Sequence, residues 1–204
     1  PHAMNSEALM LALTIAKSLG SLPVDDVFVM RKTVIDGSAV SGFQRTALIA
    51  LDGKISTSKG EVPIPTLALE EESSGIIERK GEETVYRIDR LGIPLIEIAT
   101  SPGIKNGLHA LEVAEAIGRL LRSTGKVQRG LGSIRQDLNI SISQGARVEI
   151  KGVQDLKLIP KLVDNEVQRQ ISLLKVRQAL LERHVLLGDE HFGIKNIAEL
   201  FGNT

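Results

Sequence analysis

The sequence predicts an α+β fold in which a mainly antiparallel sheet is covered by packing helices. Strand-like segments follow one another through much of residues 27–139, and a run of strands without regular helical crossovers favours antiparallel pairing. Helical periodicity is confined to three stretches, near 5–19, 108–123 and 160–187. The 204 residues are 42% hydrophobic, which is enough for one substantial core or two small ones.

The first element expected is a packing helix. Residues 1–4 are interpreted as an expression remnant, and Asn5 or Ser6 can cap a helix that runs to Leu19. Gly20 supplies the stop.

Strands are expected next, with Asp52-Gly53 as one of the turns between them. The predicted strands cover residues 27–35, 46–51, 64–69, 85–88 and 94–99.

A helix over 108–123 separates these strands from two more, at 133–142 and 148–150. Pro160 suits the first turn of a long helix that runs to about residue 187. A flexible joint is expected at Gly188-Asp189. The expected organisation is therefore a domain over 5–188 and a terminal segment over 189–204 that includes one more short helix.

Composition excludes several broad classes of function. Lys plus Arg and Asp plus Glu both number 25, so net charge gives no argument for nucleic-acid or membrane binding. Aromatic residues make up 2% of the chain, which disfavours base-stacking platforms for single-stranded nucleic acid. The absence of cysteine fits a reducing compartment, and no apolar run reaches transmembrane length, so a cytoplasmic protein without a membrane partner is expected.

Glu97 lies inside the otherwise apolar run GIPLIEIA at 92–99, where a buried strand is expected. Burying an unpaired carboxylate costs at least several kcal/mol, so such a residue needs a cation, a metal or several donors. A plain ion pair with an arginine would satisfy Glu97 as well.

Three adjacent carboxylates, Glu70, Glu71 and Glu72, end the strand-like segment before Gly75. A solvated charge run is the simplest explanation. However, two carboxylates about 4 Å apart repel by roughly 4 kcal/mol at an effective dielectric constant of about 20, and a hard divalent cation would relieve that repulsion.

Strand alternation predicts a polar face over 133–141 that includes Ser133, Arg135 and Asp137. Lys151 continues the same pattern after the strand at 148–150. An outer face exposed to solvent would give this alternation too.

Together these residues suggest a phosphoryl-transfer site. Glu70 or Glu71, Glu97 and Asp137 form an oxygen-rich set of the kind that Mg²⁺ prefers. Arg135 and Lys151 could then hold phosphoryl oxygens.

The other motifs give little evidence of function. The glycines of RGLGS at 129–133 indicate a tight turn, and no GxxxxGK[ST] phosphate loop is present. His109 and His184 have no partner at metal-ligand spacing and are predicted to be structural or exposed. A basic group lies around the C-terminal end of the helix over 108–123 and is explained as a solvated terminus that complements the helix dipole, with an RNA patch as the alternative. Its members are Arg119, Arg122, Lys126 and Arg129.

Four motifs resemble the B/E family of tRNA-dependent amidotransferases in order and spacing: DRLGIPLIEI (89–98), LEEE (69–72), GSIRQDLNIS (132–141) and VEIK (148–151). DGS (36–38), SGFQRT (41–46) and QDLN (136–139) are similar to the archaeal E branch. The resemblance implies a cradle-shaped α/β domain that uses ATP and Mg²⁺ to phosphorylate the glutamyl group of Glu-tRNA(Gln). Ammonia from a partner, an asparaginase-like glutaminase that forms the D component of such complexes, then displaces the phosphate.

By motif position, Glu70 or Glu71 and Glu97 match the family's metal-binding carboxylates, and Asp137 matches its acidic residue on the adjoining strand. Ser133, Arg135 and Lys151 are the expected nucleotide-binding residues, and Arg135, Asp137 and Lys151 the expected catalytic ones. Alternation favours Glu70 over Glu71, but a bulge would reverse that.

The chain departs from the family pattern by lacking its opening strand with Glu and His ligands, and its later insertion and tRNA-binding regions. A truncated cradle domain with little activity alone is therefore expected. A tRNA-docking or subunit-assembly module is the main alternative. A metal-dependent hydrolase would need a nucleophile or histidine base that the sequence does not offer.

Overall fold

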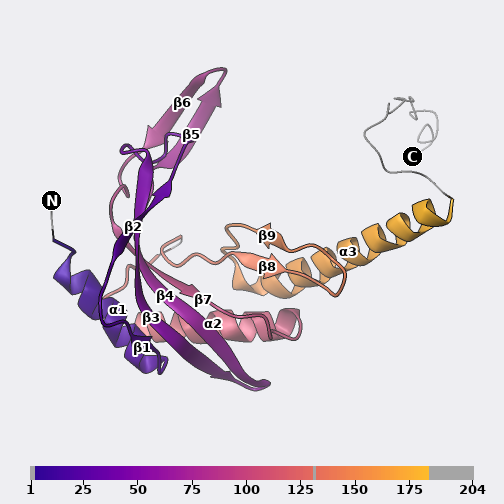
Figure 1. The fold of residues 1–204 in the computed structure, drawn as a ribbon, viewed down its shortest axis with the longest axis horizontal. Coiled ribbons are helices and arrows are strands. Elements are labelled where there is room, and N and C mark those ends of the chain that lie inside the picture. Colours follow the sequence, from indigo (N-terminus) through magenta and orange to yellow (C-terminus); the bar gives the residue numbers. More distant parts are fainter. Residues whose placement is uncertain (1–2, 131, 184–204) are drawn as a thin grey trace.

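The computed structural model describes residues 3–130 and 132–183, and it confirms the predicted α+β class (Figure 1). A twisted antiparallel sheet forms the centre, with helices packed against it, and a hairpin extends beyond one end of the sheet. A small second hairpin lies beside the long third helix. In the described part of the chain, no helix is long and apolar enough to cross a membrane.

Helix α1 (Ser6–Ser18) begins where the sequence predicts. The Asn5 side chain accepts a hydrogen bond from the backbone N–H of Ala8 at 3.0 Å and so caps the first turn. Gly20, with φ of 66°, follows the last turn. Ala12 and Ile15 on the inner side of the helix are fully buried.

The central sheet is built from five strands in antiparallel register. Its order is β1-β3-β4-β7, and β2 pairs with β3 beside β1. The strands are β1 (Leu22–Pro23), β2 (Val29–Thr33), β3 (Phe43–Thr57), β4 (Gly60–Glu71) and β7 (Pro94–Ala99).

The predicted turn at Asp52-Gly53 is wrong, because β3 continues through it to Thr57. Asp52 does adopt a positive φ of 55°, but Gly53 stays paired with Ile64 on β4. A Cβ atom at Gly53 would clash with the hydroxyl of Ser21. The glycine thus permits close backbone approach instead of chain reversal.

A separate hairpin, β5 (Gly75–Lys80) with β6 (Glu83–Arg87), projects from the sheet (Figure 1). The sequence predicted β6 in part and missed β5. Five of the six β5 residues are exposed, so this strand lacks the buried alternation that marks a strand in sequence.

Helix α2 (Gly107–Ser123) confirms the prediction to within one residue, with Asn106 as its cap. His109 is structural, as expected. It is buried, with its Nε2 2.9 Å from Thr57 Oγ1, and its Nδ1 accepts a hydrogen bond from the backbone N–H of Lys105 at 3.1 Å.

The strand predicted over 133–142 shrinks to β8 (Leu138–Ile140), so residues 133–137 are irregular and the alternation argument fails there. Gly132, with φ of 76°, breaks the extended chain, and the Gln136 carbonyl instead accepts a hydrogen bond from the backbone N–H of Val153 at 3.1 Å. β9 (Val148–Ile150) matches its prediction.

After the short 3₁₀ helix η1 (Leu156–Leu158) comes α3 (Ile159–Glu182), with Pro160 in its first turn as predicted. The predicted helix end near residue 187, His184, the joint at Gly188-Asp189 and the terminal segment 189–204 lie outside the described residues.

The described part of the chain packs around two apolar clusters. The larger joins α1, β3 and β4 and includes Leu121 of α2, while the smaller joins α2 to α3 through Ala110, Val153 and Ile159. Together, α1 and α2 therefore cover one face of the sheet and leave the other face for polar groups.

The contact between α2 and α3 predicts opposite effects for one substitution at two glycines of α2. A Cβ at Gly107 would lie 2.5 Å from Pro160 Cα, so Gly107→Ala should lower the free energy of unfolding by about 1–3 kcal/mol through overpacking. At Gly118 the nearest atom is the mobile Arg122 Nη1 at 3.2 Å. Gly118→Ala should therefore raise the free energy of unfolding by up to about 1 kcal/mol, because alanine has the higher helix propensity. Urea denaturation measures both, and equal shifts would contradict this packing.

Candidate functional site

The register between β4 and β7 brings two glutamates to the uncovered face of the sheet. Ala68 pairs with Glu97, and Glu70 pairs with Leu95. Paired residues share a face, so Glu70 and Glu97 are diagonal neighbours, a spacing that long side chains can bridge. Their neighbours Leu69 and Ile96 point to the opposite face and join the larger core.

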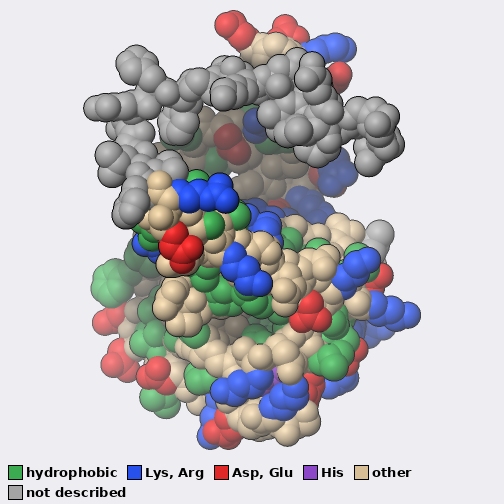
Figure 2. All heavy atoms as spheres, turned by 90° about the vertical axis from the view of Figure 1, so that its right-hand side faces the viewer, with side chains coloured by type: hydrophobic (Ala, Val, Ile, Leu, Met, Phe, Trp, Pro, Cys, Tyr) green, Lys and Arg blue, Asp and Glu red, His purple; other side chains and the backbone are tan. Residues whose placement is uncertain are grey.

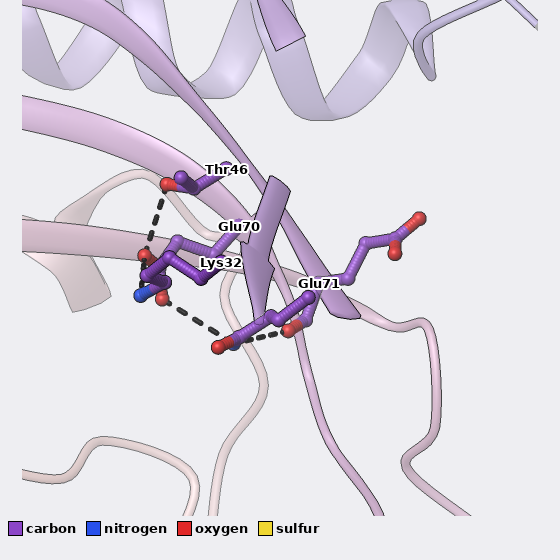
Figure 3. Close-up of polar contacts among 5 residues, drawn as sticks. Lys32, Thr46, Glu70 and Glu71 are labelled. Atoms are coloured by element: carbon purple, nitrogen blue, oxygen red, sulfur yellow. Dashed lines mark hydrogen bonds and ion pairs between the residues drawn. The ribbon is translucent and has the colours of Figure 1, made fainter. Parts of the chain in front are cut away.

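Glu70 is the buried carboxylate of this site, with 8% of its surface exposed. Lys32 Nζ of β2 lies 2.5 Å from Glu70 Oε1, and the hydroxyl of Thr46 on β3 donates to the same oxygen at 2.9 Å (Figure 3). Gln44 Nε2 donates to Oε2 at 3.4 Å and to the Glu71 backbone carbonyl at 2.6 Å. Residues of β2 and β3 thus hold one carboxylate of β4.

Sequence reasoning assigned no role to Lys32, Gln44 or Thr46. The usable signal was alternation: in the register of β2 with β3, Lys32 pairs with Gln44, and Thr46 pairs with Glu70 on β4. Applying strand parity to 29–33 and 43–46 would have placed all three on the face of Glu70.

Glu97 differs from the expectation of a carboxylate buried in a strand. Glu97 is exposed, because Ile96 and Ile98 turn toward the core and the residue between them faces the open side of the sheet. Partial desolvation, a hydrogen bond with Glu70 and repulsion by the Glu70 charge raise the pKa of Glu97 above its ordinary value.

Burial alone would raise the pKa of Glu70 too. Hydrogen bonds with Lys32, Glu97 and Thr46 outweigh that effect, so the pKa of Glu70 lies below its ordinary value. The two carboxyls therefore titrate as a coupled pair in which Glu97 is the last to lose its proton.

Asp137 lies close enough to this pair for its charge to raise the pKa of Glu97 further. One of its oxygens, Oδ1, accepts a hydrogen bond from the backbone N–H of Gly152 at 2.8 Å. Asp137 therefore connects two loops, and its charge acts on the Glu70–Glu97 pair.

Glu71 and Glu72 are engaged elsewhere. Glu71 points away from Glu70 (Figure 3), and Arg45 Nη1 lies 2.6 Å from Glu71 Oε1. Glu72 forms an ion pair with Arg135. Of the two carboxylates that the sequence left open, Glu70 is the one beside Glu97.

Two of the predicted phosphate-binding residues, Lys151 and Ser133, contact residues of their own segments. Lys151 Nζ is 3.4 Å from Glu149 Oε2, and both side chains are solvent-exposed. The Ser133 hydroxyl donates to the Gly130 carbonyl at 2.7 Å. Arg135, through Glu72, is the cation tied most closely to the acidic strand end.

Within the described ranges, no three His, Cys, Asp or Glu side chains are arranged as a metal-binding group. Two adjacent carboxylates still fit Mg²⁺, which proteins usually hold through one or two carboxylates while water and substrate phosphate complete the shell. Partial burial and the charges of Glu70 and Asp137 raise the pKa of Glu97, and such a cation would remove the charge repulsion.

On the face shown in Figure 2, Lys and Arg side chains are interspersed with Asp, Glu and hydrophobic ones. This mixed surface agrees with the zero net charge and offers no broad cationic field for nucleic acid.

Comparison with known proteins identifies the family of this chain. Residues 1–196 match the family model described as "GatB/GatE catalytic domain". The chain is similar to the E-type subunits of the glutamyl-tRNA(Gln) amidotransferases from Pyrococcus abyssi, at 55% identity over 204 residues, and Methanosarcina acetivorans, at 55% over 204. These alignments cover 100% of this chain and 32% of each relative.

The corresponding protein of Aeropyrum pernix is 60% identical over 185 residues, which are 91% of this chain and 29% of that protein. The chain thus spans about a third of the length of the curated relatives it matches. With the matched family model covering nearly the whole chain, the protein belongs to the GatB/GatE catalytic domain family.

Proposed function

We propose that this chain forms part of the catalytic centre of a tRNA-dependent amidotransferase that converts Glu-tRNA(Gln) to Gln-tRNA(Gln). In this reaction the glutamyl carboxylate attacks the γ-phosphorus of ATP, ADP leaves, and ammonia then displaces the phosphate from the acyl phosphate. The observation that carries the proposal is the Glu70–Glu97 pair, two ionisable carboxyls on the open face of the sheet beside Asp137.

The acidic pair would hold Mg²⁺, with Glu70 and Glu97 as ligands and Asp137 as a further negative charge. A bound Mg²⁺ would neutralise charge on the ATP phosphates and orient them for transfer. Lys32 and Thr46 fix the Glu70 carboxylate in place before any ligand arrives, which keeps one ligand preorganised.

Arg135 is the best placed of the proposed phosphate-binding residues. Its guanidinium pairs with Glu72, two positions beyond Glu70, and a guanidinium can hold a phosphoryl group through two parallel hydrogen bonds. Lys151, exposed at the end of β9, and Ser133 would contribute weaker contacts to the nucleotide.

The proposal extends to partners and compartment. Ammonia would come from an asparaginase-like glutaminase that assembles with this protein, and the aminoacyl substrate from tRNA(Gln), in the cytoplasm of an archaeal cell. The archaeal relatives support this assignment, since each is named as one subunit of a glutamyl-tRNA(Gln) amidotransferase.

A tRNA-docking or assembly module is the second candidate. The exposed outer part of α3, with Leu173, Val176 and Leu181, favours a protein contact more than an RNA contact. Retention of tRNA by this chain that falls steeply with salt would favour docking, since phosphate contacts release counterions.

Thermal melting with and without Mg²⁺ tests the acidic pair. The raised pKa of Glu97 stabilises the fold below the ordinary glutamate pKa, and this contribution is lost as pH rises through the raised value. In metal-free buffer at neutral pH, Glu97→Gln should therefore raise Tm by removing repulsion with Glu70. Mg²⁺ at about 100 times its Kd should stabilise the parent protein by about 2.7 kcal/mol and the variant far less.

Glu71→Gln is the matched control, because Glu71 follows Glu70 on the same strand but pairs with Arg45. It should keep the full response to Mg²⁺. If Glu71→Gln loses the response to Mg²⁺ and Glu97→Gln keeps it, Glu71 is the ligand and the assignment of Glu97 is wrong.

A second test compares two arginines in similar ion pairs. Arg135→Gln in the full-length protein with its glutaminase partner should slow ATP-dependent phosphorylation of Glu-tRNA(Gln) by about 10²-fold, the scale of removing one donor to a developing charge. Arg45→Gln breaks the neighbouring pair with Glu71 and should leave the rate within about 3-fold, as expected for an exposed pair. Equal losses would mean that Arg135 serves only the fold.

A further inference from the structure

A cavity of about 320 Å³ lies between the C-terminal half of α2 and the loop that follows it. Its volume is at the lower end of the range of small-molecule sites, about 300–1,000 Å³. Its apolar lining consists of Ala114 of α2, Ile134 and Leu156 of η1. Six polar side chains line it too: Arg122, Gln128, Arg129, Ser133, Gln136 and Gln154.

Among the described residues that line the cavity, there are two positive charges and no carboxylate. Across residues 3–130 and 132–183, neither Arg122 nor Arg129 forms an ion pair, whereas Arg119 on the same helix lies 3.6 Å from Glu115. Gln128 and Gln154 add amide donors. A concave surface with two uncompensated guanidinium groups favours an anion with several oxygens.

The backbone around the cavity fits this arrangement. Gly118 sits inside α2, where glycine lowers helix stability, and the Arg122 guanidinium folds back over it: a Cβ there would lie 3.2 Å from Nη1. Gly130 and Gly132 have φ of 110° and 76°, so the opposite wall needs glycines for its turns.

That wall is tied down on both sides. Arg90 Nη1 donates to the Gly132 carbonyl at 3.0 Å, and Val153 N–H donates to the Gln136 carbonyl at 3.1 Å. The Gln136 side chain donates in return to the Val153 carbonyl. The cavity is therefore formed before any ligand enters, which lowers the entropy cost of binding.

We propose that this cavity is a phosphate-binding site, in which Arg122 and Arg129 clamp a phosphate group while Gln128 and Gln154 contact its neighbouring sugar or base. The site goes beyond the acidic pair and needs no metal. The loop 132–137 connects the cavity with the acidic pair. Ser133 and Gln136 line the cavity, whereas Arg135 pairs with Glu72 and the charge of Asp137 acts on Glu97. The phosphate could belong to a nucleotide or to an RNA strand.

The test is a pair of titrations on the full-length protein in buffer without divalent cations. Fluorescently labelled ADP and a short labelled single-stranded RNA serve as separate probes. Arg122→Gln with Arg129→Gln should weaken binding of one probe by about 10-fold or more, since each guanidinium–phosphate contact is charge-assisted. If RNA is the ligand, its salt slope should fall by about 0.7 for each lost contact.

Arg119→Gln with Arg87→Gln is the matched control, because it removes the same charge at exposed arginines paired with Glu115 and Asp89. It should change neither affinity by more than about 2-fold, the scale of long-range screened charges. Weakening of ADP alone identifies a nucleotide site, and weakening of RNA alone identifies an RNA site.

Unchanged binding of both probes, or equal losses in the two double variants, would overturn the proposal. Because the buffer holds no divalent cation, these titrations do not depend on Mg²⁺ binding at the acidic pair. The phosphate site can therefore fail while the acidic pair stands, or stand while the acidic pair fails.

Discussion

The antiparallel register between β4 and β7 is the constraint on which the candidate site depends. It pairs Glu70 with Leu95 and Glu97 with Ala68, so both carboxyls emerge on one face while Leu69 and Ile96 enter the core on the other. A slip of β7 by one residue would exchange its two faces and place Glu97 in the apolar core. The packing of α1 against the opposite face therefore fixes the chemistry of the open one.

Within that frame, Glu70 and Glu97 have different environments. Lys32 and Thr46 hold Glu70 ionised despite its burial, whereas Glu97 has Glu70 and Asp137 as acidic neighbours and keeps its proton longer. An acidic pair of this kind is poised to gain from a divalent cation, because the cation replaces repulsion with attraction to both groups. One loop, 132–137, joins the acidic pair to the arginine cavity, which suits a centre that holds phosphate beside metal.

Much of the fold could be predicted from local pattern. Capping at Asn5, the apolar spacing of α1 and α2, and Pro160 in the first turn of α3 are short-range signals that the tertiary structure did not override. The failures had tertiary causes. Asp52-Gly53 resembles a hairpin turn, yet Gly53 is needed for contact with Ser21, and residues 133–137 alternate like a strand although glycine turns and Val153 hold them in a loop.

The sequence by itself determined which residues could form an acidic site, because carboxylates at a strand end and inside an apolar run need partners. It also determined the family resemblance, since four motifs in order identify it without coordinates. Only the tertiary structure decided that Glu70 is the buried member, that Glu71 turns to Arg45, and that Lys32 from a distant strand supplies the counter-charge. Pairing between strands far apart in sequence sets these contacts, and no local pattern specifies which strands meet.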